Sequence, residues 1–114
     1  MKKIEAIVRP EKVRTILSAL KEIGINGETV VSEKGQGRGM RPLIRDSKGM
    51  PLHTAEYNPM NSIITIVDDL KVNAVMEAIA KVAISRSKGS GKVFVFPVDE
   101  VMDLESGRRS MNLV

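Results

Sequence analysis

Apolar and polar residues alternate near the start of the chain and then recur at helical spacing. Residues 2–9 predict a half-buried strand because three apolar side chains share one parity there: Ile4, Ala6 and Val8. Residues 10–24 predict an amphipathic helix, with Pro10 suited to the first turn, Gly24 to the C-terminal cap, and one apolar stripe: Val13, Ile16, Leu17, Leu20 and Ile23. The β-branched residues of 27–34 predict a second strand.

The same order of elements returns in the second half of the chain. Residues 62–67 and 92–98 predict strands, and residues 69–83 between them predict a helix whose start Asp69 can cap. The apolar face of that helix consists of Val72, Val75, Met76, Ile79 and Ala83. Two strand-helix-strand units in one short chain predict an α+β, ferredoxin-like βαββαβ fold, with four strands and both helices on one face of the sheet.

The connection between the second and third strands is far longer than a hairpin turn. It takes about 26 residues, 35–60, which are polar and rich in glycine and proline, with nothing that would bury a face. Residues 34–60 also hold most of the net charge of +4, because five basic residues face two acidic ones: Lys34, Arg38, Arg41, Arg45 and Lys48 against Asp46 and Glu56. Such a segment is either a solvated loop or a contact surface for anions or an acidic partner.

The overall composition is that of a globular domain. A length of 114 residues is typical of one domain with its own core, and the chain is 42% hydrophobic and 28% charged. It has no cysteine, which excludes disulfides, thiolate metal sites and cysteine nucleophiles. No run approaches the roughly 20 apolar residues that span a bilayer, and the N-terminal segment lacks the pattern of a signal peptide. We therefore expect a cytoplasmic protein.

The stretch "GSGK", residues 89–92, stands immediately before the last predicted strand. Successive backbone N–H groups in a glycine-rich turn can converge on an anion, and Lys92 would add a positive charge beside them. The stretch is too short for a P-loop, which needs two glycines with four residues between them, then a lysine and a hydroxyl on a following helix. Taken alone, it fits a simple turn into a strand better than a phosphate site.

Three segments together resemble the PII signal-transduction proteins, once called nitrogen regulatory proteins: "MKKIEAIVRPEKV", "GINGETVVSEKGQGRG" and "GSGKVFVFPV". The resemblance implies one PII-like domain over residues 1–114, assembled as a homotrimer with adenine nucleotide in the clefts between subunits. It also implies a T-loop at residues 36–60 that contacts target proteins, a B-loop at residues 84–92, and a C-terminal loop and tail at residues 99–114.

The resemblance further implies which residues bind the nucleotide. By position these are Thr29, Gly35, Gly37, Arg38, Ile66, Gly89, Ser90, Gly91 and Lys92. The expected cofactor is ADP or ATP, with AMP as a further candidate, and whether magnesium accompanies it stays open. We expect a regulator and not an enzyme, with at most slow incidental ATP hydrolysis. Its T-loop would bind a membrane transporter or a metabolic enzyme, through Arg41, Arg45, Ser47 and Lys48.

Two departures from the family pattern concern 2-oxoglutarate. Gly39 stands where typical members have a glutamine that helps hold magnesium and 2-oxoglutarate, and Met60 stands where a lysine normally pairs with its carboxylate. Glycine brings no side-chain ligand and methionine brings no charge. A dicarboxylate would lack the contacts that offset its desolvation, so we expect usual 2-oxoglutarate binding to be absent or weak.

Two further departures concern the phosphates. Typical members carry two arginines in the C-terminal loop, where this chain has Asp103 and Glu105. Three arginines are candidate replacement phosphate contacts, Arg86, Arg108 and Arg109, with Arg109 the last to test because its tail can be disordered. The alternative is a cleft that prefers a less charged ligand such as ADP or AMP.

Other readings of the chain keep less support. Tyr57 lies near the descending base of the loop, so Ser47 is the hydroxyl placed for modification at the tip. His53 is the only histidine, and a single loop histidine is more often a surface residue than a metal ligand. An RNA-binding module would stack bases on Phe94 and Phe96, which core packing explains more simply. A hydrolase would need a positioned nucleophile or base. A PII scaffold that binds another small ligand, or acts by protein contacts alone, remains the main alternative.

Overall fold

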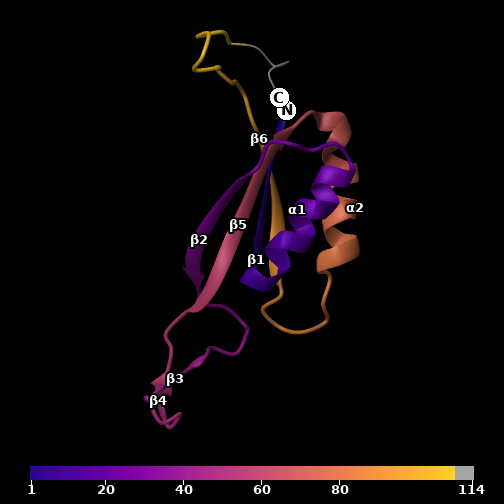
Figure 1. Cartoon of the computed structure of the whole chain (residues 1–114). Coiled ribbons are helices and arrows are strands. Elements are labelled where there is room, and N and C mark those ends of the chain that lie inside the picture. The colour runs from indigo at the N-terminus through magenta and orange to yellow at the C-terminus, as the bar shows by residue number, and fades with distance from the viewer. Residues whose placement is uncertain (110–114) are drawn as a thin grey trace.

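Four strands form one antiparallel sheet in the computed structural model, which describes residues 1–109 (Figure 1). The spatial order is β2-β5-β1-β6, and each neighbouring pair runs antiparallel. The bounds are β1 (Lys2–Val8), β2 (Thr29–Gly35), β5 (Asn58–Val67) and β6 (Gly91–Pro97). With the two helices described next, the chain has the expected α+β class.

The two helices lie on the same face of this sheet (Figure 1). A 3-10 turn, η1 (Pro10–Lys12), leads into α1 (Val13–Glu22), and a second, η2 (Asp69–Lys71), leads into α2 (Val72–Ala83). Pro10 opens the first of them, as predicted. Gly24 follows α1, where the N–H of Ile25 donates to the Leu20 carbonyl at 3.0 Å and closes the helix. None of the described helices is long and apolar enough to cross a bilayer.

The hydrophobic core fills the space between the helices and the covered face of the sheet. Alternate residues of the central strands β1 and β5 enter it, together with the apolar stripes of both helices. Each fully buried isoleucine or leucine contributes roughly 1.5–3 kcal/mol relative to an exposed one. The buried members are Ile4, Ala6, Val8, Ile16, Leu20, Ile25, Ile63, Val67, Val75 and Ile79.

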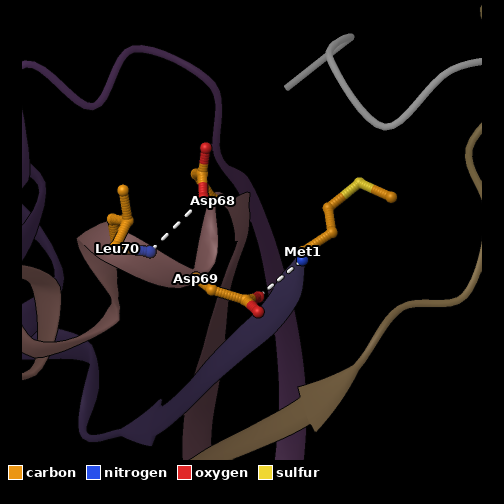
Figure 2. Close-up of polar contacts among 4 residues, drawn as sticks. All are labelled: Met1, Asp68, Asp69 and Leu70. Carbon is orange, nitrogen blue, oxygen red and sulfur yellow. Dashed lines mark hydrogen bonds and ion pairs between the residues drawn. The ribbon is translucent and has the colours of Figure 1, made fainter.

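The start of the second helical segment differs from the sequence prediction by one residue (Figure 2). Asp68, which has extended backbone angles, accepts the N–H of Leu70 at 3.3 Å and is the cap. Asp69 already belongs to the 3-10 turn, and its carboxylate accepts a hydrogen bond from the Met1 ammonium at 2.5 Å. The prediction that Asp69 caps the helix is therefore wrong. The hydrogen bond from the ammonium lowers the pKa of Asp69, and the nearby Lys2 adds to the effect.

The long loop contains regular structure that the sequence analysis did not expect. Two short strands, β3 (Leu43–Arg45) and β4 (Pro51–Thr54), pair as a hairpin that projects beyond the end of the main sheet (Figure 1). The Asp46 carboxylate accepts the N–H groups of Lys48 at 2.9 Å and Met50 at 2.8 Å and so forms the turn. Pairing of β2 with β5 closes the loop between Gly35 and Asn58.

Candidate functional site

The two glycine-rich segments meet at one end of the sheet. The long loop and the loop at residues 84–92, here called the glycine loop, both leave this end (Figure 1). Gly39 and Gly89 lie so close that a Cβ added to Gly89 would stand 2.6 Å from the Gly39 Cα. The contact forms within one chain, between residues that are fifty positions apart in the sequence.

Arg9 joins this contact and was not among the predicted site residues. It follows β1 directly, and its guanidinium donates from Nε to the Gly89 carbonyl at 3.0 Å and from Nη2 to the Lys88 carbonyl at 2.9 Å. The pairing of Val8 with Gly91 brings Arg9 to the glycine loop. The sequence alone carried one signal for this role, a basic residue just past a strand that a βαββαβ fold pairs with the last strand.

The glycine loop is also tied to itself and to the sheet. The Ser90 hydroxyl donates to the Ser87 carbonyl at 2.6 Å, so it serves the shape of the loop. A Cβ at Gly91 would overlap the Ile7 carbonyl oxygen, which shows how tightly the start of β6 lies on β1. Lys92 then enters β6 on the face away from the helices, where it is exposed.

The remaining residues expected near the phosphates lie at the same end of the sheet. Gly35 ends β2, and its Cα lies against the Met60 side chain, since an added Cβ would stand 3.1 Å from the Met60 Cγ. Gly37 and the exposed Arg38 continue toward Gly39. This end thus collects seven of the nine predicted nucleotide-binding residues: Gly35, Gly37, Arg38, Gly89, Ser90, Gly91 and Lys92.

Thr29 and Ile66 lie elsewhere, in a pocket of about 640 Å³ toward the other end of the strands. The strand register puts Gly91 level with Asn61, and Ile66 is five residues farther along β5. At roughly 3.3 Å per residue, that is about 17 Å along the strand. Within one chain, therefore, the predicted residues form two separate groups.

The C-terminal segment leaves the sheet at this far end, because the N–H of Val98 donates to the Met1 carbonyl at 3.1 Å. Asp103 accepts the N–H groups of Glu105 at 2.7 Å and Ser106 at 3.3 Å, so it forms a turn. Arg109 forms an ion pair with Glu100, while Arg108 is exposed. Of the candidate replacement cations, only the exposed Arg86 belongs to the glycine loop. The expected tail continues to residue 114, and residues 110–114 lie outside the described part.

Two of the exposed basic residues expected to bind partners also hydrogen-bond within the long loop. Gln36 and Arg41 both donate to the Glu56 carbonyl, at 2.9 Å and 3.4 Å. Arg45 donates to the Gly49 carbonyl at 2.9 Å. Ser47 and Lys48 are exposed at the hairpin tip. Exposed apolar side chains accompany them in the loop: Met40, Leu43, Ile44, Met50 and Leu52.

The lone histidine and the tyrosine of the long loop are both solvent-accessible. His53 belongs to β4, opposite Ile44, and Tyr57 lies at the foot of the loop. Residues 1–109 contain no group of three or more histidine or acidic side chains that could hold a metal ion.

The face of the sheet away from the helices carries both apolar and charged side chains and is uncovered within the chain. Val31, Phe94 and Phe96 are 41%, 40% and 42% exposed on it. The prediction that Phe94 and Phe96 serve core packing is wrong, because their strand partners are the outward-facing Glu5 and Lys3. Period-2 alternation correctly placed the two rings on one face, but the covered face is the other one. An RNA-binding sheet would need such rings on its central strands, whereas β6 is an edge strand.

These features define a small α+β scaffold that offers backbone amides at one end and a protruding basic loop beside them. The family model for Nitrogen regulatory protein P-II matches residues 1–108, and the chain belongs to this family. It is therefore a regulatory protein of the PII signal-transduction class, as the sequence resemblance implied.

Individual relatives agree with this assignment over the whole chain. The Nitrogen regulatory protein P-II of Azospirillum brasilense is 38% identical over 111 residues, which are 96% of each chain. The protein of the same name from Rhizobium meliloti is 34% identical and covers both chains fully. Nitrogen regulatory protein P-II 2 of Methanothermobacter thermautotrophicus is 35% identical over all of this chain and 97% of its own.

Proposed function

We propose that the protein is a homotrimeric regulator that senses adenine nucleotides in clefts between its subunits. The ligands are ATP and ADP, with AMP as a further candidate. The T-loop, residues 36–60, transmits the bound state to a target transporter or metabolic enzyme. One observation carries the proposal: the predicted site residues form two groups in one chain, with Thr29 and Ile66 about 10 and 17 Å along the strands from the level of Gly91, so we infer that a second subunit completes the site.

The group at the glycine loop suits the phosphates. Backbone amides of a glycine-rich loop bind anions well, and three exposed cations belong to the segments at this end of the sheet: Arg38, Arg86 and Lys92. The group at the far end suits the base and ribose, because its pocket combines the apolar Ile64 and Ile66 with the Thr29 hydroxyl.

The arrangement of the two groups favours a closed ring. Joining the glycine loop of one subunit to the far pocket of the next is a head-to-tail contact, which closes when the rotation allows it. The exposed apolar side chains on the open face of the sheet support the same assembly, since three such faces can cover one another.

The residues at the glycine-loop end of the sheet argue against the usual 2-oxoglutarate site. Gly39 lies against Gly89 and has no side chain to offer. Met60 lies against Gly35 and carries no charge. The proposed regulator therefore responds to nucleotides without the usual response to 2-oxoglutarate.

Two measurements on the purified protein test this function. Light scattering after size exclusion gives the mass, which we expect to be that of a trimer. Calorimetric titration with ATP, ADP, AMP and 2-oxoglutarate should give heats for ATP and ADP and none comparable for 2-oxoglutarate. A monomer, or a trimer that binds no adenine nucleotide, would refute the proposal.

A charge on the open face should separate the subunits. We expect Phe94→Glu to lower the measured mass, because trimer formation would bury an unpaired carboxylate against apolar side chains. Leu70→Glu is the matched control, since Leu70 is 91% exposed on η2. If Phe94→Glu keeps the wild-type mass, the open face is not the subunit interface.

A second candidate is a PII scaffold that binds another small ligand or acts by protein contacts alone. The C-terminal segment favours it, because Asp103 is fixed in a turn and Arg109 is paired with Glu100. The segment then has less spare positive charge for phosphates than the family pattern provides. The calorimetric experiment separates the candidates, since this one predicts a trimer without nucleotide binding.

A further inference from the structure

The guanidinium of Arg9 donates hydrogen bonds to two successive carbonyl groups of the glycine loop. Nε donates to the Gly89 carbonyl at 3.0 Å, and Nη2 donates to the Lys88 carbonyl at 2.9 Å. Arg9 is half-buried, and the rigid guanidinium fork fixes the direction of both acceptors at once. The hydrogen bonds span eighty and seventy-nine positions of sequence, so they tie the loop to the end of β1.

These two hydrogen bonds determine the direction of the neighbouring N–H groups. A peptide group is planar and trans, so the N–H of a residue points opposite to the carbonyl of the residue before it. With the carbonyls of Lys88 and Gly89 held toward Arg9, the N–H groups of Gly89 and Ser90 face the other way. Neither donates to a backbone acceptor in the described part of the chain. Two adjacent N–H groups that share a direction make a concave anion site.

The base of the long loop contacts the same cluster. A Cβ on Gly39 would lie 3.1 Å from the Arg9 Nη2 and 3.2 Å from the Gly89 Cα, which is tighter than ordinary contact. A side chain at Gly39 would require Arg9 or the glycine loop to shift by a few tenths of an ångström. Arg9, Gly39 and Gly89 therefore form one contact unit.

We infer that Arg9 is the positioning residue of the phosphate-binding loop: it turns the N–H groups of Gly89 and Ser90 toward a phosphate and links that loop to the long loop through Gly39. The inference rests on the proposed nucleotide site and adds a residue to it. Because the guanidinium is engaged by two carbonyls, Arg9 acts through the backbone and does not need to touch the ligand.

Calorimetric titrations with ATP and with adenosine test the effect on binding. In Arg9→Met we expect ATP to bind about tenfold more weakly, while adenosine, which has no phosphate, binds as in the wild type. Arg14→Met is the matched control, because it removes the same charge from an exposed site on α1 and should change neither affinity. Equal losses for ATP and adenosine in Arg9→Met would overturn the inference.

Arg9→Lys separates positioning from simple charge. Lysine keeps the positive charge but lacks the rigid double donor, so we expect ATP affinity to stay well below that of the wild type. If Arg9→Lys binds ATP as the wild type does, Arg9 acts as a cation on the ligand and the inference fails.

Amide NMR spectra of the ligand-free protein give a readout that does not depend on nucleotide binding. In Arg9→Met the resonances of Gly39, Gly89 and Ser90 should move together, and in Arg14→Met they should stay in place. Gly39→Ala should also move those of Gly89 and Ser90, because its Cβ crowds the contact. If the wild type bound no nucleotide, the proposed function would fail and with it the phosphate role, yet these shifts would still show whether Arg9 positions the loop. Unchanged resonances in Arg9→Met would overturn the inference.

Discussion

The glycine loop and the tip of the long loop are both turns rich in polar residues, but they are held in different ways. The glycine loop is fixed from outside, by the Arg9 guanidinium and by the packing of Gly91 on Ile7. The hairpin tip is fixed from within, by Asp46 accepting two N–H groups and by Arg45 donating to the Gly49 carbonyl. The first loop is thus tied to the sheet, whereas the hydrogen bonds that hold the second lie within the tip itself.

This difference matches the two tasks of the regulator proposed above, in which the glycine loop binds the ligand and the long loop contacts the partner. A binding loop needs fixed amides, because the cost of ordering it would otherwise reduce affinity. An arm that reaches a partner needs at least two orientations, and a ligand shifts it only through different affinities for them. A change at the glycine loop could reach the long loop through the contact of Gly39 with Gly89.

The largest effect should come from Gly91→Ala. The added Cβ would overlap the Ile7 carbonyl oxygen, and the φ of +114° is one that side chains rarely adopt. We expect a loss of about 3 kcal/mol or more in the free energy of unfolding, measured by urea denaturation. Gly37→Ala is the control, since nothing lies within 4 Å of its added Cβ. Equal stability of the two variants would mean that the glycine loop is no more fixed than the long loop.

The sequence predicted those features of the fold that depend on local patterns. Helical spacing located both helices, and Gly24 marked the end of the first because the capping turn needs only neighbouring residues. The β3–β4 hairpin carried a readable signal that was missed, an aspartate and a glycine three positions apart between two short apolar runs. The long loop was judged by its composition, which hides so short a pattern.

What the sequence could not predict depends on distant contacts. Arg9 and Gly89 are eighty positions apart, and only the strand register brings them together. Asp68 and Asp69 are identical side chains, and the choice of cap depends on the backbone angles and on the Met1 ammonium. Alternation placed Phe94 and Phe96 on one face, but which face the helices cover is set by the whole fold.

The next largest effect concerns the hairpin tip. Asp46→Ala removes the acceptor for two N–H groups, at Lys48 and Met50, so amide exchange across the tip should become faster. The free energy of global unfolding should change by less than about 1 kcal/mol, because the tip contacts solvent. Hydrogen exchange followed by mass spectrometry measures the first, and Ser47→Ala is the control. An unchanged exchange rate in Asp46→Ala would show that the tip is held by contacts outside itself.

The smallest effect should appear at the opposite end of the sheet and should leave both loops unaffected. The hydrogen bond from the Met1 ammonium lowers the pKa of Asp69 in the folded protein, so this contact stabilises the fold above the unfolded pKa. That contribution is lost as the pH falls through the lower, folded pKa. Urea denaturation at several pH values should therefore show the wild type more stable than Asp69→Asn at neutral pH, with the difference shrinking below pH about 4. A difference that grows on acidification would reverse the sign of the linkage and would mean that the carboxylate is held in its protonated form.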